Sequence, residues 1–361
     1  MMEKLVELSH KEMLKIDRDY EQTAKVADLV YVSDQDAGIL RQKKGTGFSY
    51  TYKDEPVTDE KTLERIKKLA IPPAWTNVWI CKRENGHIQA TGFDVKNRKQ
   101  YRYHPQWNLL RNQTKFHRLY EFGKVLPSIR LKVEEDLTKK ELSEEKVLAT
   151  VVSLMERTFI RIGNDGYEKL YGSYGLTTLK DSHVKVNGNT VQFSFKGKKG
   201  VYHNITLKNP KLAKLVKQCR DIPGKELFQY FDNEGNRHSI DSGMVNQYIK
   251  EASGGDFTAK DFRTWAGTLH ILQCFCSLEN PGSDADCKKN IVAALDEVSQ
   301  KLGNTRTVCK KYYVHPGIIK LYEDRSLNKY LKQLDEIEKD DHLTGITSEE
   351  RVLMKILKQL V

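Results

Sequence analysis

The sequence predicts an α+β protein with a small β-rich N-terminal domain and a larger, mainly helical domain that contains a three-stranded β meander. Two dipeptides, Asn85-Gly86 and Asn187-Gly188, lie between strand-like runs and predict hairpins, because both residue types tolerate positive φ angles. From about Leu109, apolar residues recur at three-to-four spacing, which is typical of amphipathic helices. We therefore predict an N-terminal extension at 1–24, a β-rich domain at 25–108 and a helical domain at 109–361.

The N-terminal third mixes helical and strand patterns. The extension reads as an amphipathic helix, with candidate anchors at Leu5, Leu8, Met13 and Ile16. A β-type run at 29–32 predicts a strand, and 58–70 predicts a short helix that ends before Pro72-Pro73. The first hairpin is predicted to pair 77–81 with 87–91.

The remainder is predicted to be helical with two β interruptions. Apolar spacing predicts helices over 116–120, 126–133 and 147–157. The meander is predicted from three runs, at 183–186, 190–195 and 201–207. A short hairpin is predicted around 233–236.

The composition favours a polyanionic partner. The 361 residues carry a net charge of +11, which points first to nucleic acid and second to a membrane surface. With 39% hydrophobic and 30% charged residues, the chain reads as a soluble globular protein. The sequence has no apolar run of about 18 residues, so it predicts no membrane span. The charged N-terminus lacks the apolar core of a signal peptide. We expect the protein to act inside a cell.

The sequence gives no sign of a metal or nucleotide cofactor. The six cysteines are scattered, without a CxxC pair or a histidine cluster at ligand spacing, so we predict reduced thiols and no metal site. Neither a Walker A loop nor a GxGxxG motif after a strand is present, so we expect no bound nucleotide.

The segment from Asn97 to Trp107 combines cations, an amide and aromatic side chains. In an extended conformation, Tyr101 and Tyr103 fall on one face of the strand. Arg98 can bind phosphate, while Gln100 and the tyrosines can reach base edges. The alternative is that the two tyrosines pack across strands.

A tyrosine pair, Tyr312 and Tyr313, follows two lysines near the C-terminus. With a reference pKa of about 10, a phenol is a weak nucleophile at neutral pH unless cations or a base assist it. The alternative is that both tyrosines pack a helix onto the core. Asn304 precedes this pair in the same segment.

Three further places could supply the cations. Arg161 lies between Ile160 and Ile162, so we expect it to be half-buried and to need an anion, either a carboxylate or a phosphate. Lys198 lies in a glycine-flanked turn, where lysines are usually solvated.

The third place is a predicted helix start at Thr258. Its first turn carries Lys260 and Arg263 on one face, where free backbone N–H groups also favour an anion. Two arginines, a loop lysine and a tyrosine are what a metal-free attack on a phosphodiester requires. Arginines hold the charged oxygens, a lysine protonates the leaving oxygen, and the tyrosine forms the ester.

The chain resembles the type IB DNA topoisomerases, specifically the short poxvirus-like and bacterial-type members, from about Asp28 to Tyr322. The resemblance rests on the order of several motifs: IPPAW at 71–75, GHIQATG at 86–92, RKQY at 98–101, RIGN at 161–164, GLTTL at 175–179, GK at 197–198, KDFRT at 260–264 and LGNT at 302–305.

The resemblance implies a role for each matching residue. Tyr313 would attack the scissile phosphate and form a 3′-phosphotyrosyl link, and Lys198 would protonate the leaving 5′ hydroxyl. Arg161 and Arg263 would clamp the phosphate, with Lys260 as an auxiliary cation. Asn304 stands where poxvirus members have a histidine, so it can donate a hydrogen bond but brings no charge.

The resemblance also implies how the protein meets DNA. Gln100, Tyr101, Tyr103 and Tyr167 match family positions that contact DNA. The family fold is a two-domain, C-shaped clamp around duplex DNA that nicks one strand, allows rotation and reseals, without ATP or an essential metal. We expect a monomer, located in a bacterial cytoplasm or nucleoid, or in a virion or viral factory.

Two alternatives use the same residues differently. A tyrosine recombinase shares the catalytic set but usually carries His-x-x-Arg, where this chain has Lys260 and Arg263. A non-catalytic, architectural DNA-binding protein could keep the fold, but the retention of Arg161, Lys198 and Tyr313 argues against it.

Overall fold

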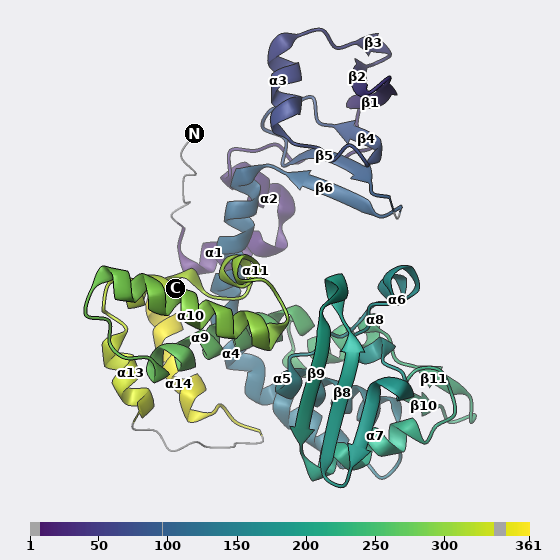
Figure 1. The fold of residues 1–361 in the computed structure, drawn as a ribbon, viewed down its shortest axis with the longest axis vertical. Helices are drawn as coiled ribbons and strands as arrows, with labels where there is room; N and C mark the ends of the chain where they lie inside the picture. The colour runs from purple at the N-terminus through teal and green to yellow at the C-terminus, as the bar shows by residue number, and fades with distance from the viewer. Residues whose placement is uncertain (1–7, 96, 336–343) are drawn as a thin grey trace. The chain divides into compact units, whose positions relative to one another are not determined.

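The structure is a computed structural model that describes residues 8–95, 97–335 and 344–361 (Figure 1). Its helices and antiparallel sheets make it a mixed α+β protein, as predicted. The chain divides into two compact units, Met1–Arg118 and Leu119–Val361, and the division falls within the long helix α4 (Pro105–Leu137). A search of the described residues finds no helix with the length and apolar character needed to cross a membrane.

The first unit contains a six-stranded antiparallel sheet in the order β3-β2-β1-β4-β5-β6. Its strands are β1 (Ile39–Lys44), β2 (Gly47–Tyr52), β3 (Glu55–Pro56), β4 (Thr76–Ile80), β5 (Ile88–Phe93) and β6 (Lys99–Tyr103). The pairing of β4 with β5 confirms the first predicted hairpin. Strand β6 lies at an edge of this sheet, with one strand neighbour.

Helix α3 (Glu60–Lys68) confirms the predicted short helix. Its N-cap, Asp59, accepts a hydrogen bond from the Thr62 backbone N–H, which satisfies one of the free donors of the first turn. Ile66 is the buried residue of α3, and it packs in one cluster with Ile39 and Ile80 of the sheet. Burial of this apolar face stabilises the helix on the sheet.

The extension forms two helices, α1 (His10–Arg18) and α2 (Tyr20–Val26), rather than the single helix predicted. Asp19 separates them because its side chain caps α2. The predicted anchors Met13 and Ile16 are buried against Trp107 of α4, and Leu8 packs at the edge of this cluster. Leu5 lies outside the described residues.

Two local predictions in this unit are wrong. Residues 29–32 form no strand, since only Val30 makes an isolated bridge, to Gly86, while Leu29 is buried with α1 and α2. The β4–β5 connection spans 81–87, close to the predicted 82–86, but neither Asn85 nor Gly86 has the positive φ angle expected of a tight turn at this dipeptide. The buried Gln89 amide organises this loop by donating to the carbonyl oxygens of Glu84 (2.9 Å) and Gly86 (2.8 Å).

The second unit is mainly helical and includes a three-stranded sheet, β7-β8-β9, that confirms the predicted meander. The short hairpin of β10 and β11 is confirmed too. The strands are β7 (Val184–Asn187), β8 (Thr190–Lys196), β9 (Tyr202–Lys208), β10 (Gln229–Phe231) and β11 (Arg237–Ser239). The helices are α5 (Glu144–Thr158), α6 (Asp165–Tyr171), α7 (Pro210–Arg220), α8 (Ser242–Ser253), α9 (Ala259–Ser277), α10 (Asp284–Leu302), α11 (Arg306–Tyr312), α12 (Pro316–Glu323), α13 (Asn328–Asp335) and α14 (Ser348–Leu360).

Helices α5 and α9 form the centre of this unit, because most of their residues are buried on all sides. A buried ionic network ties α14 to them. Arg130 of α4 pairs with Glu350 (2.8 Å) and Glu156 (2.7 Å), and Glu350 also accepts a hydrogen bond from the Trp265 indole (3.0 Å). The Glu350 carboxylate is fully partnered, as a buried charge requires.

Candidate active site

Tyr313 is held at the end of α11 by contacts with the middle of α9. Its backbone oxygen accepts a hydrogen bond from Thr268 Oγ1 (3.3 Å), which in turn accepts from the backbone N–H of His315 (3.1 Å). The same oxygen lies so close to Gly267 that a Cβ there would be 2.5 Å from it. The segment therefore packs on α9 only because residue 267 is glycine. Tyr313 is half-buried, whereas Tyr312 is 40% exposed.

Two guanidinium groups lie beside the Tyr313 side chain. Burial lowers the pKa of both Arg161 and Arg263, and interaction with the Tyr313 phenol opposes that effect. The Arg263 guanidinium carbon lies 5.1 Å from the centre of the tyrosine ring. These three predicted site residues come from the loop after α5, from the first turns of α9 and from the end of α11, and the structure brings them together.

Arg263 is 5% exposed, and its fixed position comes from backbone oxygens. It donates to the oxygens of Leu302 (2.7 Å) and Phe159, and its Nε is buried without a hydrogen-bond partner among the described residues. Its helix begins at Thr258, whose hydroxyl and backbone N–H both bond to Asp261. This confirms the predicted helix start.

Neither arginine has a carboxylate partner within the part of the chain that the structure describes. The Arg161 partners among the described residues are the Asn304 Oδ1 atom (2.5 Å) and the Gly303 backbone oxygen (3.3 Å), both neutral, rather than the carboxylate considered as an alternative. Burial and the neighbouring charge of Arg263 lower the pKa of Arg161, and burial lowers that of Arg263. Two like charges close together without an anion form an anion-binding site.

Asn304 follows the last turn of α10, where Gly303 adopts a left-handed φ of 57°. The side-chain oxygen of Asn304 accepts from Arg161, and its amide nitrogen contacts the Leu302 backbone oxygen at 3.4 Å. Asn304 thus orients Arg161 and keeps a second N–H that can donate to an anion.

The two predicted lysines lie at the surface. Lys198 is exposed in the turn between β8 and β9, and its ammonium is 5.8 Å from the Tyr167 ring. Lys260 is exposed in the first turn of α9. The described contacts join neither ammonium to Tyr313.

His203 is a site residue that the sequence analysis missed. A Cβ placed on Gly303 would lie 2.4 Å from its Cε1 atom, and one placed on Gly197 would lie 2.6 Å from its Cδ2 atom. The ring also stacks on Phe195, with centroids 5.0 Å apart. His203 therefore connects the residue before Lys198 to the residue before Asn304. A histidine five residues after the lysine gave no spacing signal.

The predicted DNA-contact residues of the first unit form an exposed strand face. Tyr101 and Tyr103 are 42% and 38% exposed, and their rings stack at 5.7 Å, which places them on one face of β6 as predicted. Arg98 and Gln100 both contact Asp94, at 2.5 and 3.1 Å. In the second unit, Tyr167 on α6 is 39% exposed.

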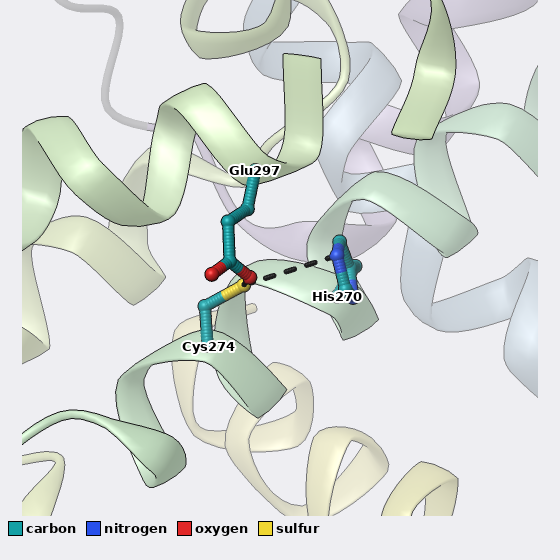
Figure 2. Close-up of side chains that lie close together, drawn as sticks. All are labelled: His270, Cys274 and Glu297. Carbon is teal, nitrogen blue, oxygen red and sulfur yellow. Dashed lines mark hydrogen bonds between the residues drawn. The ribbon is translucent and has the colours of Figure 1, made fainter. Parts of the chain in front are cut away.

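A separate cluster could hold a metal ion. His270 and Cys274 of α9 and Glu297 of α10 place one ligand atom each within 4.8 Å of the others (Figure 2). The sequence predicted no metal site, because it has no CxxC pair and no histidine cluster at ligand spacing. A histidine and a cysteine four residues apart on one helix are the sequence signal for this cluster.

Comparison with known proteins identifies the class: an isomerase that acts on DNA topology. The family described as "Eukaryotic DNA topoisomerase I, catalytic core" matches residues 98–341, and "Bacterial DNA topoisomerase IB, N-terminal domain" matches residues 47–94. DNA topoisomerase 1B of Acanthamoeba polyphaga mimivirus is 36% identical over 296 residues, covering 80% of this chain and 88% of the relative. DNA topoisomerase 1B of vaccinia virus (strain Copenhagen) is 24% identical over 281 residues, covering 75% and 85%.

The chain belongs to the type IB DNA topoisomerases, and it relaxes supercoiled duplex DNA. This confirms the resemblance found in the sequence. Among the three functions considered there, it selects the topoisomerase over the recombinase and the architectural protein.

Proposed function

We propose that the chain relaxes DNA by cutting one strand through Tyr313, allowing rotation, and resealing the strand. The Tyr313 hydroxyl attacks the scissile phosphate, a 3′-phosphotyrosyl bond forms, and the 5′ oxygen leaves. Religation is the reverse reaction, in which the 5′ hydroxyl attacks the ester. Because the ester conserves the energy of the phosphodiester, the cycle needs neither ATP nor an essential metal.

One observation carries this proposal: two buried or half-buried arginines, with no carboxylate partner among the described residues, lie beside the same tyrosine side chain. A phosphate at this point would supply the missing anion and lie next to the nucleophile. Arg161 and Arg263 then stabilise the charge that develops on the non-bridging oxygens. The buried Nε of Arg263 offers a further donor.

The other predicted site residues complete the reaction. Lys198, exposed in the turn between β8 and β9, protonates the leaving 5′ oxygen. Asn304 positions Arg161 and donates its remaining N–H, and Lys260 adds positive charge near the phosphate. His203 acts through its neighbours, because its ring lies against the glycines before Lys198 and Asn304.

We propose that Arg98, which directly precedes β6, the β6 residues Gln100, Tyr101 and Tyr103, and Tyr167 on α6 contact the duplex. The exposed, stacked tyrosines and the nearby cations suit a groove with flanking phosphates. The β-rich domain at 25–108 and the catalytic domain at 109–361 close around DNA as a C-shaped clamp, with 1–24 as an extension. A monomer suffices for this, acting where DNA is held inside a cell or a virion.

Plasmid relaxation tests the proposal directly. We expect the full chain to relax both positively and negatively supercoiled plasmid in EDTA, without ATP. A requirement for a divalent metal or for ATP would contradict the mechanism, as would relaxation of only one sign of supercoils.

Arg161→Ala and Arg263→Ala should each slow the reaction by about two orders of magnitude or more, as loss of a donor to a developing oxyanion does.

A further inference from the structure

Helices α9 and α10 bring together three side chains of the type that bind transition metals. His270 and Cys274 are one helical turn apart on α9, so they lie on the same face. Cys274 Sγ is 3.9 Å from His270 Nε2 and 3.0 Å from Glu297 Oε2 (Figure 2). All three ligand atoms lie within 4.8 Å of one another.

These separations fit a tetrahedral ion. Zinc binds nitrogen, sulfur and carboxylate oxygen at about 2.0–2.3 Å, so its ligand atoms lie roughly 3.3–3.8 Å apart. The two contacts of Cys274, at 3.0 and 3.9 Å, lie just outside that range on either side, and the three atoms come within 4.8 Å of one another. A nitrogen, a thiolate and a carboxylate also make a borderline-soft set that selects zinc over magnesium or calcium.

The surroundings favour metal binding through His270 Nε2. The Gln273 side-chain oxygen lies 3.2 Å from His270 Nδ1. It can accept a hydrogen bond from a protonated Nδ1, which leaves Nε2 free as a metal ligand. His270, Gln273 and Lys301 line a pocket, which gives an ion a route to the site. One feature opposes binding: the Lys301 ammonium is 3.2 Å from the same Nδ1 atom.

We propose that His270, Cys274 and Glu297 form a zinc-binding site with a fourth position open to water. The bound ion links α9 to α10. These helices also carry Arg263 near one end of α9 and Gly303-Asn304 after the end of α10, so the ion stabilises the scaffold of the arginine site without touching the phosphate.

Binding changes the protonation of the cluster. The Cys274 thiol donates a hydrogen bond to the Glu297 carboxylate in the metal-free form, and it must lose its proton to become a ligand. Zinc therefore displaces one proton to solvent, and affinity rises with pH. The charged groups that face the cluster are Lys301 and Glu297 from α10 and, through Gln273, Glu349 from α14.

Cobalt(II) and zinc titrations of the EDTA-treated, dialysed full chain test the site. We expect one equivalent of Co²⁺ to give the intense thiolate-to-cobalt absorption, which added Zn²⁺ then removes. Cys274→Ser should abolish that absorption and weaken Zn²⁺ binding by at least about tenfold. Glu297→Gln should weaken Zn²⁺ binding by a similar factor. Cys276→Ser, two residues along the same helix, is the matched control and should leave both unchanged.

Lys301→Met gives a test with the opposite sign. Removal of this ammonium relieves repulsion of the ion, so Zn²⁺ affinity should increase. Absence of the thiolate absorption in the wild-type chain would overturn the proposal, and so would equal Zn²⁺ affinity in the wild type and in folded Cys274→Ser. The readout is metal binding, so it is independent of whether Tyr313 is the nucleophile.

Discussion

Single residues of the site are arranged so that an anion completes them. Arg161 and Arg263 lose hydration on folding, and among the described residues their hydrogen bonds go to neutral oxygens, namely those of Asn304, Gly303, Leu302 and Phe159. Desolvated charges without a counterion are costly, and a bound phosphate relieves that cost. In the proposed mechanism, the site is therefore organised for the phosphate before DNA arrives, which is the basis of electrostatic catalysis.

Lys198 is predicted to act as the general acid. Lys198→Ala should slow strand cleavage by about two to four orders of magnitude, because a 5′ alkoxide is a poor leaving group without a proton. A substrate with a 5′-bridging sulfur needs no proton, so it should restore most of the rate. Single-turnover cleavage of both substrates measures this. An equally slow variant on the sulfur substrate would remove Lys198 from the acid role.

His203 is predicted to position the site rather than to transfer a proton. His203→Ala should slow single-turnover cleavage by about tenfold with little change in DNA affinity, because the Lys198 turn and Asn304 lose a shared contact. His203→Phe keeps the ring and should restore most of the rate. The neighbouring Tyr202→Ala, at a side chain that is 77% exposed, is the control.

Two results would count against this role of His203. A wild-type rate for His203→Ala would show that the contact is unimportant. A slow His203→Phe variant with an altered pH–rate profile would instead indicate proton transfer by the imidazole.

At the scale of elements, the site forms where three helices meet: the first half of α9, the end of α10 and the end of α11. Their close approach depends on Gly267, where a Cβ would lie 2.5 Å from the Tyr313 backbone oxygen and 3.2 Å from Leu302 Cδ1. An alanine in a helix usually stabilises relative to glycine, by about 1 kcal/mol. Here the steric clash outweighs that gain.

Gly267→Ala should lower the free energy of unfolding by about 1–3 kcal/mol and reduce covalent cleavage, because the Tyr313 segment must move away from α9. Urea unfolding and single-turnover cleavage measure the two effects. Gly282→Ala is the matched control, since its Cβ would come no closer than 3.8 Å to any other group. Unchanged stability and cleavage in Gly267→Ala would contradict the packing described here.

Local chemistry made several elements predictable from sequence. Asn187-Gly188 specifies the β7–β8 turn, where Gly188 has φ 55°, and Thr258 and Asp261 specify the start of α9. Contacts between distant segments were not predictable in the same way. Periodicity alone indicates neither that Leu29 joins the α1–α2 cluster nor that His203 lies between two glycines.

The site residues divide along the same line. Arg161, Arg263 and Tyr313 were found because their types and neighbours suggest anion chemistry, and because they match family motifs. The structure adds that the three meet and that Asn304 holds Arg161. The cluster of His270, Cys274 and Glu297 was missed because Glu297 comes from a different helix.

At the scale of the whole molecule, histidine burial predicts a loss of stability in mild acid. Burial lowers the pKa of a set of histidines: His87, His104, His117, His183, His203 and His270. Below the unfolded-state pKa of about 6.5, the unfolded chain binds protons that the folded chain does not. The free energy of unfolding therefore decreases as the pH is lowered, by at most about 1.4 kcal/mol per pH unit for each histidine.

Urea unfolding at about pH 7.5 and pH 5.5 measures this effect. The net charge of +11 also disfavours the compact state as pH falls, so both curves should be repeated at high salt. Salt screens the charge repulsion but does not remove the cost of protonating a buried imidazole. Equal or greater stability at the lower pH would contradict the prediction.

The central claim is that Tyr313, and not Tyr312, forms the covalent bond to DNA. The most direct measurement is the protein–DNA adduct trapped with denaturant on a nicked duplex that cannot religate, compared for the wild type, Tyr313→Phe and Tyr312→Phe. We predict an adduct for the wild type and Tyr312→Phe, and none for Tyr313→Phe, which should still bind DNA. An adduct in Tyr313→Phe, or its loss in Tyr312→Phe alone, would contradict the assignment.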